Sequence, residues 1–222
     1  MGIVVTAQAL LFDMDGTLID STAAVERTWR RFAARHGLDA AAILASAHGQ
    51  RTADTVAAHA PRGTDLDTET AWLVAQDVAD TRGTVALPGA AELLAALPPD
   101  RWALVTSAGR ELAERRMAAA GLPLPEVVVT ADDVRHGKPH PEGYHTAARR
   151  LGVDPRATIV FEDAELGLLA GRAAGGYTVV VGHHGGEAAE GRPRITDYLG
   201  ANCSDTGDGL RLTLPARAGA TV

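Results

Sequence analysis

Short apolar runs end in polar turns at several places along the chain. These apolar runs lie at residues 9–12, 102–106, 127–130, 158–161 and 177–181. Runs of this length, rich in Leu, Val and Ile, are typical of strands that are buried on both faces of a sheet. Each run therefore predicts one strand of a common sheet.

Helical segments separate the later runs. They are expected at residues 90–97, 111–120, 141–151 and 164–174, and the last three are followed by Gly121, Gly152 and Gly175. Glycine ends a helix easily because it adopts the left-handed conformation of the C-terminal cap. Strands alternating with helices predict a doubly wound α/β fold, in which helices cover both faces of a parallel sheet. Ligands of such sheets bind beyond the carboxyl ends of the strands.

The stretch between the first strand and residue 85 breaks this alternation, because it contains helical patterns only. A helix begins after Asp20 or Ser21, either of which can cap it, and Gly37 ends it. Its apolar face repeats at helical spacing, with Val25, Trp29, Phe32 and His36. Further helices are expected at residues 41–47, 52–59 and 68–80.

This break predicts two domains. Residues 1–17 and 86–222 form an α/β catalytic core, and residues 18–85 form a helical cap that covers the active edge of the sheet. Near the C-terminus, residues 210–214 alternate like an edge strand, and residues 216–222 are expected to be frayed.

Composition and charge narrow the class of protein. The chain has 222 residues, 46% of them hydrophobic, and 21 basic against 28 acidic residues give a net charge of −7. Without a basic block, nucleic acid and anionic membrane surfaces are not expected partners. No apolar run is long enough to span a membrane and no signal sequence is visible, so we expect a cytoplasmic protein. A single cysteine excludes an internal disulfide.

The first strand ends in two carboxylates, Asp13 and Asp15, followed by Gly16. Glycine lets the backbone turn so that its N–H groups face an anion. Two such acids can divide the chemistry, because one can attack as a nucleophile while the other gives and takes a proton. An ordinary Asp-Gly turn at the end of a strand is the alternative explanation.

Three further groups lie at later strand ends. They are the hydroxyls of Thr106 and Ser107, the ammonium of Lys138, and the acidic pair Glu162 and Asp163. Hydroxyls and an ammonium suit a phosphoryl group, and clustered carboxylates need a hard cation such as Mg²⁺. Lys138 is the only lysine among 21 basic residues, which argues that its position requires lysine. The sequence therefore predicts a site for phosphate and magnesium.

These motifs resemble the haloacid dehalogenase superfamily of phosphotransferases. The four ordered segments are Leu11-Phe12-Asp13-Met14-Asp15-Gly16-Thr17-Leu18, Val105-Thr106-Ser107, Gly137-Lys138-Pro139 and Phe161-Glu162-Asp163. The resemblance covers nearly the whole chain up to residue 181 and implies a Rossmann-like core with an inserted α-helical cap.

The resemblance also implies roles for these residues. Asp13 is the expected nucleophile that forms an aspartyl-phosphate, Asp15 the general acid and base, and Lys138 the third catalytic group. The residues expected to bind the phosphoryl group are Gly16, Thr106, Ser107 and Lys138. The expected Mg²⁺ ligands are Asp13, Glu162, Asp163 and the backbone carbonyl of Asp15. Because dehalogenases of the superfamily lack the second acid of the first motif, Asp15 argues against carbon–halogen chemistry.

Residues 46–55 of the predicted cap indicate the class of substrate. This stretch resembles the branch of glycerol-3-phosphatases and 2-deoxyglucose-6-phosphatases, whose members dephosphorylate small polyol or sugar phosphates. His48, Gly49 and Arg51 are expected to face such a substrate, since Arg51 can bind oxygens in pairs and Gly49 admits a close backbone approach. An ordinary polar junction between helices is the alternative.

Several functions stay open on this scaffold. We expect an Mg²⁺-dependent phosphatase of a small sugar, sugar-alcohol or polyol phosphate. The alternatives are a sugar phosphomutase of the β-phosphoglucomutase type, a phosphoglycolate-type phosphatase, and a catalytically silent relative, against which the intact carboxylates argue. The chain is expected to be a monomer or a weak homodimer.

Overall fold

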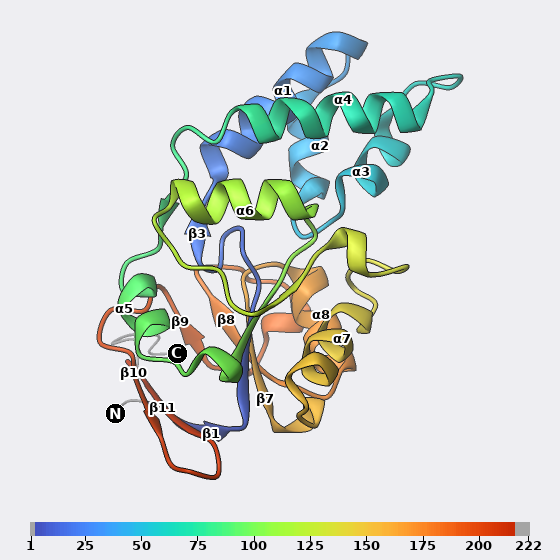
Figure 1. Cartoon of the computed structure of the whole chain (residues 1–222). Helices are drawn as coiled ribbons and strands as arrows, with labels where there is room; N and C mark the ends of the chain where they lie inside the picture. The colour runs from blue at the N-terminus through green and yellow to red at the C-terminus, as the bar shows by residue number, and fades with distance from the viewer. Residues whose placement is uncertain (1–2, 216–222) are drawn as a thin grey trace.

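The computed structural model describes residues 3–215, and its central feature is a six-stranded parallel sheet (Figure 1). The strand order is β6-β5-β2-β7-β8-β9. The bounds are β6 Val127–Val129, β5 Trp102–Val105, β2 Ala9–Phe12, β7 Thr158–Glu162, β8 Tyr177–Val181 and β9 Arg194–Ile195. The five predicted strands are confirmed, whereas β9 is too short to leave an apolar run in the sequence.

Helices cover both faces of this sheet, as the alternation predicted. Leu10 and Phe12 of β2 belong to the core cluster that includes α5 and α6, whereas Leu11 belongs to the cluster of α7 and α8. Successive strand residues point to opposite faces, so one strand supplies both cores. The bounds are α5 Ala90–Ala95, α6 Arg110–Ala119, α7 Glu142–Leu151 and α8 Glu165–Ala173. The doubly wound α/β fold is confirmed.

Four helices pack together as a separate layer at the top of Figure 1. They are α1 Thr22–His36, α2 Ala40–Ala47, α3 Thr52–His59 and α4 Leu66–Ala79. Their own apolar cluster contains Trp29, Phe32, Ile43, Val56 and Leu73. The segment is not purely helical, because the short strands β3 Ile19–Asp20 and β4 Val85–Ala86 pair antiparallel at its two connections to the sheet. Two-residue strands are too short to show a period.

A second sheet joins the two ends of the described chain. Its strands are β1 Ile3–Ala7, β10 Asn202–Asp205 and β11 Leu210–Leu214, and β11 lies in the centre, antiparallel to both neighbours. The prediction of an edge strand at residues 210–214 is therefore wrong. The alternation itself is real, since Leu210, Leu212 and Leu214 are buried in the core cluster. What it could not show is that both neighbours come from distant parts of the chain.

Irregular segments complete the structure. The short 3₁₀ helices span Pro99–Arg101, Ala131–Asp133, Pro155–Ala157 and Glu187–Ala189. Residues 216–222, predicted to be frayed, lie outside the described residues. Within residues 3–215, no helix is both long enough and apolar enough to cross a membrane.

Candidate active site

The predicted site residues meet at the carboxyl edge of the parallel sheet. Asp13 follows β2, and its N–H donates to the carbonyl of Phe161 at 3.1 Å. Thr106 follows β5 in the same way, and its N–H donates to the carbonyl of Val129 at 2.9 Å. Sheet pairing thus continues one residue beyond the strands and fixes the backbone of both residues.

Lys138 lies between two of the predicted acids. Its Nζ is 2.5 Å from Asp13 Oδ1 and 2.5 Å from Glu162 Oε1, and it also donates to the carbonyl of Val105 at 3.3 Å. The side chain is only 7% exposed. Burial opposes the charge, but Asp13 and Glu162 raise the pKa of Lys138 above its usual value. The ammonium therefore stays charged beside Asp13.

Three carboxylates converge at this edge. Oxygen atoms of Asp13, Glu162 and Asp163 all lie within 4.8 Å of one another. Burial, followed by the charge of Glu162, raises the pKa of Asp13 well above its usual range and that of Asp163 to about 7. Closely spaced carboxylate oxygens with this mutual repulsion are the ligands that a hard divalent cation stabilises. The residues present therefore fit Mg²⁺.

Glu162 is bound by one residue of a neighbouring helix and accommodated by another. Tyr144 of α7 donates its hydroxyl to Glu162 Oε1 at 2.5 Å. Burial, with the charge of Glu162, raises the pKa of Tyr144 well above its usual value, so the phenol remains a donor. Gly167 of α8 leaves room for the carboxylate, because a Cβ there would lie 2.0 Å from Glu162 Oε1. Sequence reasoning missed Tyr144, since a tyrosine on an apolar helix face is typical of the core.

Gly16 holds the turn after β2 in the conformation that the site needs. Its φ is +79°, and a Cβ at this position would lie 2.0 Å from Asp163 Oδ2. Thr17 follows it and donates its hydroxyl to Asp163 Oδ1 at 3.2 Å. The turn is held from behind by Tyr198, whose hydroxyl donates to the carbonyl of Thr17 at 3.0 Å.

Asp15 is held by residues outside the group of three acids. Ser21 donates its hydroxyl to Asp15 Oδ1 at 2.5 Å, and Arg116 Nη1 lies 2.8 Å from Asp15 Oδ2. Of the two residues predicted to cap α1, Asp20 accepts from the N–H of Thr22, whereas the side chain of Ser21 makes no capping hydrogen bond. Neither Ser21 nor Arg116 carried a functional signal in the sequence.

A cavity of about 200 Å³ lies between the sheet edge and helices α1 and α2. From the sheet side it is lined by Asp13, Asp15, Gly16, Thr106, Ser107 and Asp163. From the helices it is lined by residues that include Trp29, His48 and Gly49. Two of the three predicted cap residues therefore share one space with both acids of the first motif.

Arg51, the third residue predicted to belong to the cap, lies beside that space. Its guanidinium binds both carboxylate oxygens of Asp54, at 2.7 and 2.9 Å, and donates to the carbonyl of Arg135 at 3.1 Å. The side chain lies over Gly137, where a Cβ would be 2.8 Å from Arg51 Nε. Arg51 thus shares a smaller pocket with Lys138.

A second contact links the helices to the sheet edge. Ser107, predicted to bind phosphate, donates its hydroxyl to the carbonyl of Gly49 at 2.8 Å. The left-handed φ of Gly49, +75°, brings that carbonyl close to the core. Arg51 and Gly49 therefore both hold the helical layer against the loops of the site.

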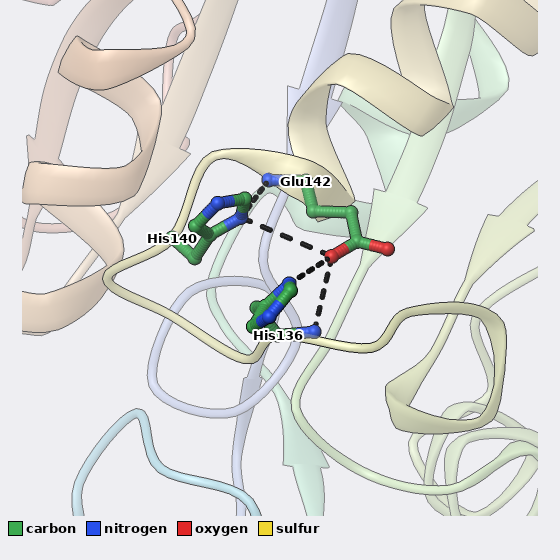
Figure 2. Close-up of side chains that lie close together, drawn as sticks. All are labelled: His136, His140 and Glu142. Carbon is green, nitrogen blue, oxygen red and sulfur yellow. Dashed lines mark hydrogen bonds and ion pairs between the residues drawn. The ribbon is translucent and has the colours of Figure 1, made fainter.

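The loop that carries Lys138 is anchored by Glu142 at the start of α7 (Figure 2). Its carboxylate accepts the backbone N–H groups of Arg135 and His136, each at 3.0 Å, and lies 2.9 Å from His136 Nδ1. These bonds, first the one from Arg135, lower the pKa of Glu142 to about 2. His140 completes the group, since its Nδ1 accepts the N–H of Glu142 at 3.2 Å. The loop is therefore fixed on both sides of Lys138.

Comparison with known proteins decides the family. The haloacid dehalogenase-like hydrolase family matches residues 7–175. The chain is a haloacid dehalogenase-like hydrolase. The resemblance seen in its four motifs is thereby confirmed, as is the prediction of an enzyme of this superfamily.

Relatives of this hydrolase carry names that agree with its motifs. It is 43% identical over 182 residues to hexitol phosphatase A of Escherichia coli (strain K12), covering 78% of this chain and 82% of that protein. It is also 43% identical over 178 residues to validoxylamine A 7'-phosphate phosphatase of Streptomyces hygroscopicus subsp. limoneus, covering 76% and 83%. A solved hydrolase from Pseudomonas syringae has a TM-score of 0.73 at 26% identity, covering 87% of this chain and 96% of that one.

Proposed function

We propose that this haloacid dehalogenase-like hydrolase is an Mg²⁺-dependent phosphatase of small sugar, sugar-alcohol or polyol phosphates. The observation that carries the proposal is that Asp13, Asp15 and Asp163 line one cavity while Lys138 lies 2.5 Å from Asp13. The substrate class is supported by the relatives, which include a hexitol phosphatase and a validoxylamine phosphate phosphatase. The cavity volume of about 200 Å³ suits a small substrate.

The first half of the reaction transfers the phosphoryl group to Asp13. A carboxylate oxygen of Asp13 attacks phosphorus, and the bond between phosphorus and the ester oxygen breaks. Asp15 donates its carboxyl proton to that oxygen, so that the product leaves as a neutral alcohol. The product of this half-reaction is an aspartyl-phosphate on Asp13 and an ionised Asp15.

The second half of the reaction releases phosphate. Asp15, now a carboxylate, takes a proton from a water molecule whose oxygen attacks phosphorus. The bond between phosphorus and Asp13 breaks, and inorganic phosphate forms. Asp13 is again ionised and Asp15 again protonated, so the cycle closes without any other reactant.

Charge on the phosphoryl oxygens is the main obstacle to both steps. Lys138 supplies a fixed positive charge, while the hydroxyl of Thr106 and the backbone turn at Gly16 donate hydrogen bonds. Ser107 joins them when its hydroxyl gives up its bond to the carbonyl of Gly49. Mg²⁺, held by Asp13, Glu162, Asp163 and the backbone carbonyl of Asp15, would neutralise further charge on the phosphoryl oxygens.

Recognition of the part of the substrate that does not react belongs to the helical layer. We assign residues 18–85 to a cap domain and residues 1–17 and 86–222 to the catalytic core. His48 and Gly49 contact the sugar or polyol from the cap side of the cavity. Arg51 can join them only by giving up its contacts with Asp54 and Arg135, and until then it holds the cap against the loop of Lys138.

The deciding experiment is a panel of phosphate esters incubated with the protein and Mg²⁺. The panel contains hexitol, glycerol and 2-deoxyglucose phosphates, phosphoglycolate, and β-glucose 1-phosphate with and without a glucose bisphosphate activator. Release of phosphate from a few sugar or polyol esters, abolished by EDTA and by Asp13→Asn, is expected. No release from any ester by the folded protein contradicts the proposal.

Two outcomes would instead favour the alternatives. Isomerisation of β-glucose 1-phosphate that depends on the bisphosphate, without net release of phosphate, indicates a phosphomutase. A strong preference for phosphoglycolate over every sugar ester indicates a phosphoglycolate-type phosphatase. Both outcomes keep Asp13 as the nucleophile, so Asp13→Asn remains inactive in each case.

A further inference from the structure

Arg116 lies where the core, the helical cap and Asp15 meet. It belongs to α6, and its side chain is only 3% exposed. Its Nη1 is 2.8 Å from Asp15 Oδ2, and its Nη2 is 2.7 Å from Oδ1 of Asp77, a residue of α4. Thr28 of α1 donates its hydroxyl to the same oxygen of Asp77 at 3.2 Å. One guanidinium therefore connects α6, the two longest cap helices and the acid after β2.

Packing alone does not account for this arrangement. A buried ion pair is often no more stabilising than apolar side chains of the same volume, because both ions lose their hydration. Burial opposes the charge of Arg116, but Asp15 and then Asp77 raise its pKa above the usual value. Burial also opposes the charge of Asp77 and raises its pKa, although Arg116 acts in the other direction. Arg116 Nε has no hydrogen-bond partner among the described residues.

We propose that Arg116 is a positioning residue, which orients the carboxyl group of Asp15 for proton transfer and ties that orientation to cap helix α4 through Asp77. The proposal rests on the function proposed above, in which Asp15 protonates the leaving oxygen. It names a residue outside the four motifs.

The contacts of Asp15 also define which of its oxygens carries the proton. Arginine has donors only, so the oxygen that faces Arg116, Oδ2, must remain an acceptor. Ser21 donates its hydroxyl to the other oxygen, Oδ1, which can still accept this bond through a lone pair when it carries a proton. Oδ1 is therefore the atom that holds the transferable proton. Displacement of α4 would move Asp77 and, through Arg116, the direction of that proton.

The experiment compares two esters that need proton donation to different degrees. An alkyl phosphate, glycerol or hexitol phosphate, has a poor leaving group that must be protonated as it departs, whereas 4-nitrophenolate leaves from 4-nitrophenyl phosphate with little help. The parameter is kcat/KM, which covers the steps up to departure of the leaving group. The variants are Arg116→Met, Arg116→Lys and the control Arg115→Met, whose side chain is 63% exposed.

In Arg116→Met, kcat/KM for the alkyl ester is expected to fall about 10- to 100-fold more than for the aryl ester, since general acid catalysis contributes about 10²- to 10⁴-fold. Arg116→Lys restores part of the alkyl activity, and Arg115→Met changes neither ester. An equal fall for both esters, or no fall, overturns the proposal.

Stability and the proposed function need their own controls. Arg116→Met leaves the carboxylate of Asp77 buried without its charged partner, so the double variant Arg116→Met/Asp77→Asn is measured beside it. If the folded double variant recovers stability but not activity on the alkyl ester, the lost activity is due to a misoriented Asp15. Recovery of both stability and activity overturns the proposal. If wild-type protein hydrolyses neither ester with Mg²⁺, the proposed function has failed, which is a different result from equal losses in an active enzyme.

Discussion

Asp13 can be tested with a change that barely alters its shape. Asparagine fills the same space and keeps an oxygen that accepts from Lys138, but its amide is a poor nucleophile. We expect Asp13→Asn to lower the rate of phosphate release about a thousandfold or more, because catalytic groups that act as a unit fail together. Circular dichroism and the unfolding midpoint check that the fold is retained. Activity within about tenfold of wild type would remove Asp13 from its proposed role.

The role of Gly16 can be tested by adding a single methyl group. Its φ of +79° disfavours any L side chain, and a Cβ would lie 2.0 Å from Asp163 Oδ2. Gly16→Ala is expected to abolish phosphate release by displacing Asp163, and to lower the free energy of unfolding by about 1–2 kcal/mol through the backbone alone.

The matched control is Gly37→Ala. Gly37 has a similar φ of +66° but nothing within 4 Å of the added Cβ. This variant shares the backbone cost and should keep full activity. If both variants lose activity equally, displacement of Asp163 is not the cause.

Single residues also show which parts of the site can be predicted from the sequence. Asp13 and Glu162 lie at strand ends, so their meeting at one sheet edge follows from the parallel fold. Lys138 lies further on, in the loop between β6 and α7, and that loop carries it back to the same edge. Arg116 and Tyr144 lie inside helices, where their spacing is that of core positions, and only the packing of α6 and α7 onto the sheet brings them to Asp15 and Glu162. Contacts of this kind depend on helix rotation and cannot be predicted from a local pattern.

At the level of elements, the four helices α1 to α4 have a core of their own. Phe32 is fully buried among Trp29, Ile43 and Leu73, and its ring packs edge-on against Trp29 at 5.9 Å. Phe32→Ala is expected to lower the free energy of unfolding by about 3–5 kcal/mol, because the cavity cannot be refilled by neighbouring side chains. Urea unfolding measures it, with the exposed Leu66→Ala as a control that should stay within about 0.5 kcal/mol of wild type. A loss below about 1 kcal/mol would show that the cap core relaxes.

The loop between β6 and α7 carries a pH-dependent contribution to stability. Burial opposes ionisation of Asp133, but Arg150 and Thr130 lower its pKa from 3.8 to about 2. A carboxyl whose pKa is lower in the folded state stabilises the protein above the unfolded value and loses this effect as the pH falls. The contribution should therefore be complete above about pH 5 and decline between about pH 4 and pH 2.

Asp133→Asn tests this directly. After allowance for solvent screening, the variant should be less stable than wild type by about 1 kcal/mol at pH 6, and the difference should shrink by pH 3. Urea unfolding at both values measures it. A difference that is independent of pH would show that the carboxylate charge is not what stabilises the loop.

On the scale of the whole molecule, the repeating pattern predicted the main sheet and its helices but not the second sheet. β1 pairs with β11, so residues 3–7 lie beside residues 210–214 at the far end of the chain. Nothing local in either segment specifies a partner so distant in sequence. For the same reason the alternation of β11 predicts only an edge strand, although two neighbours flank it. Patterns predict which side of a strand is buried, whereas strand order requires the complete fold.

The solitary lysine of this enzyme makes chemical labelling unusually informative. Lys138 is the only lysine in 222 residues, and its side chain is 7% exposed between Asp13 and Glu162. An acylating reagent therefore finds no other lysine on which to be consumed. The rate at which the peptide containing Lys138 gains mass therefore measures how often the site opens to the reagent. Ligands that keep helices α1 to α4 closed over the site should lower this rate.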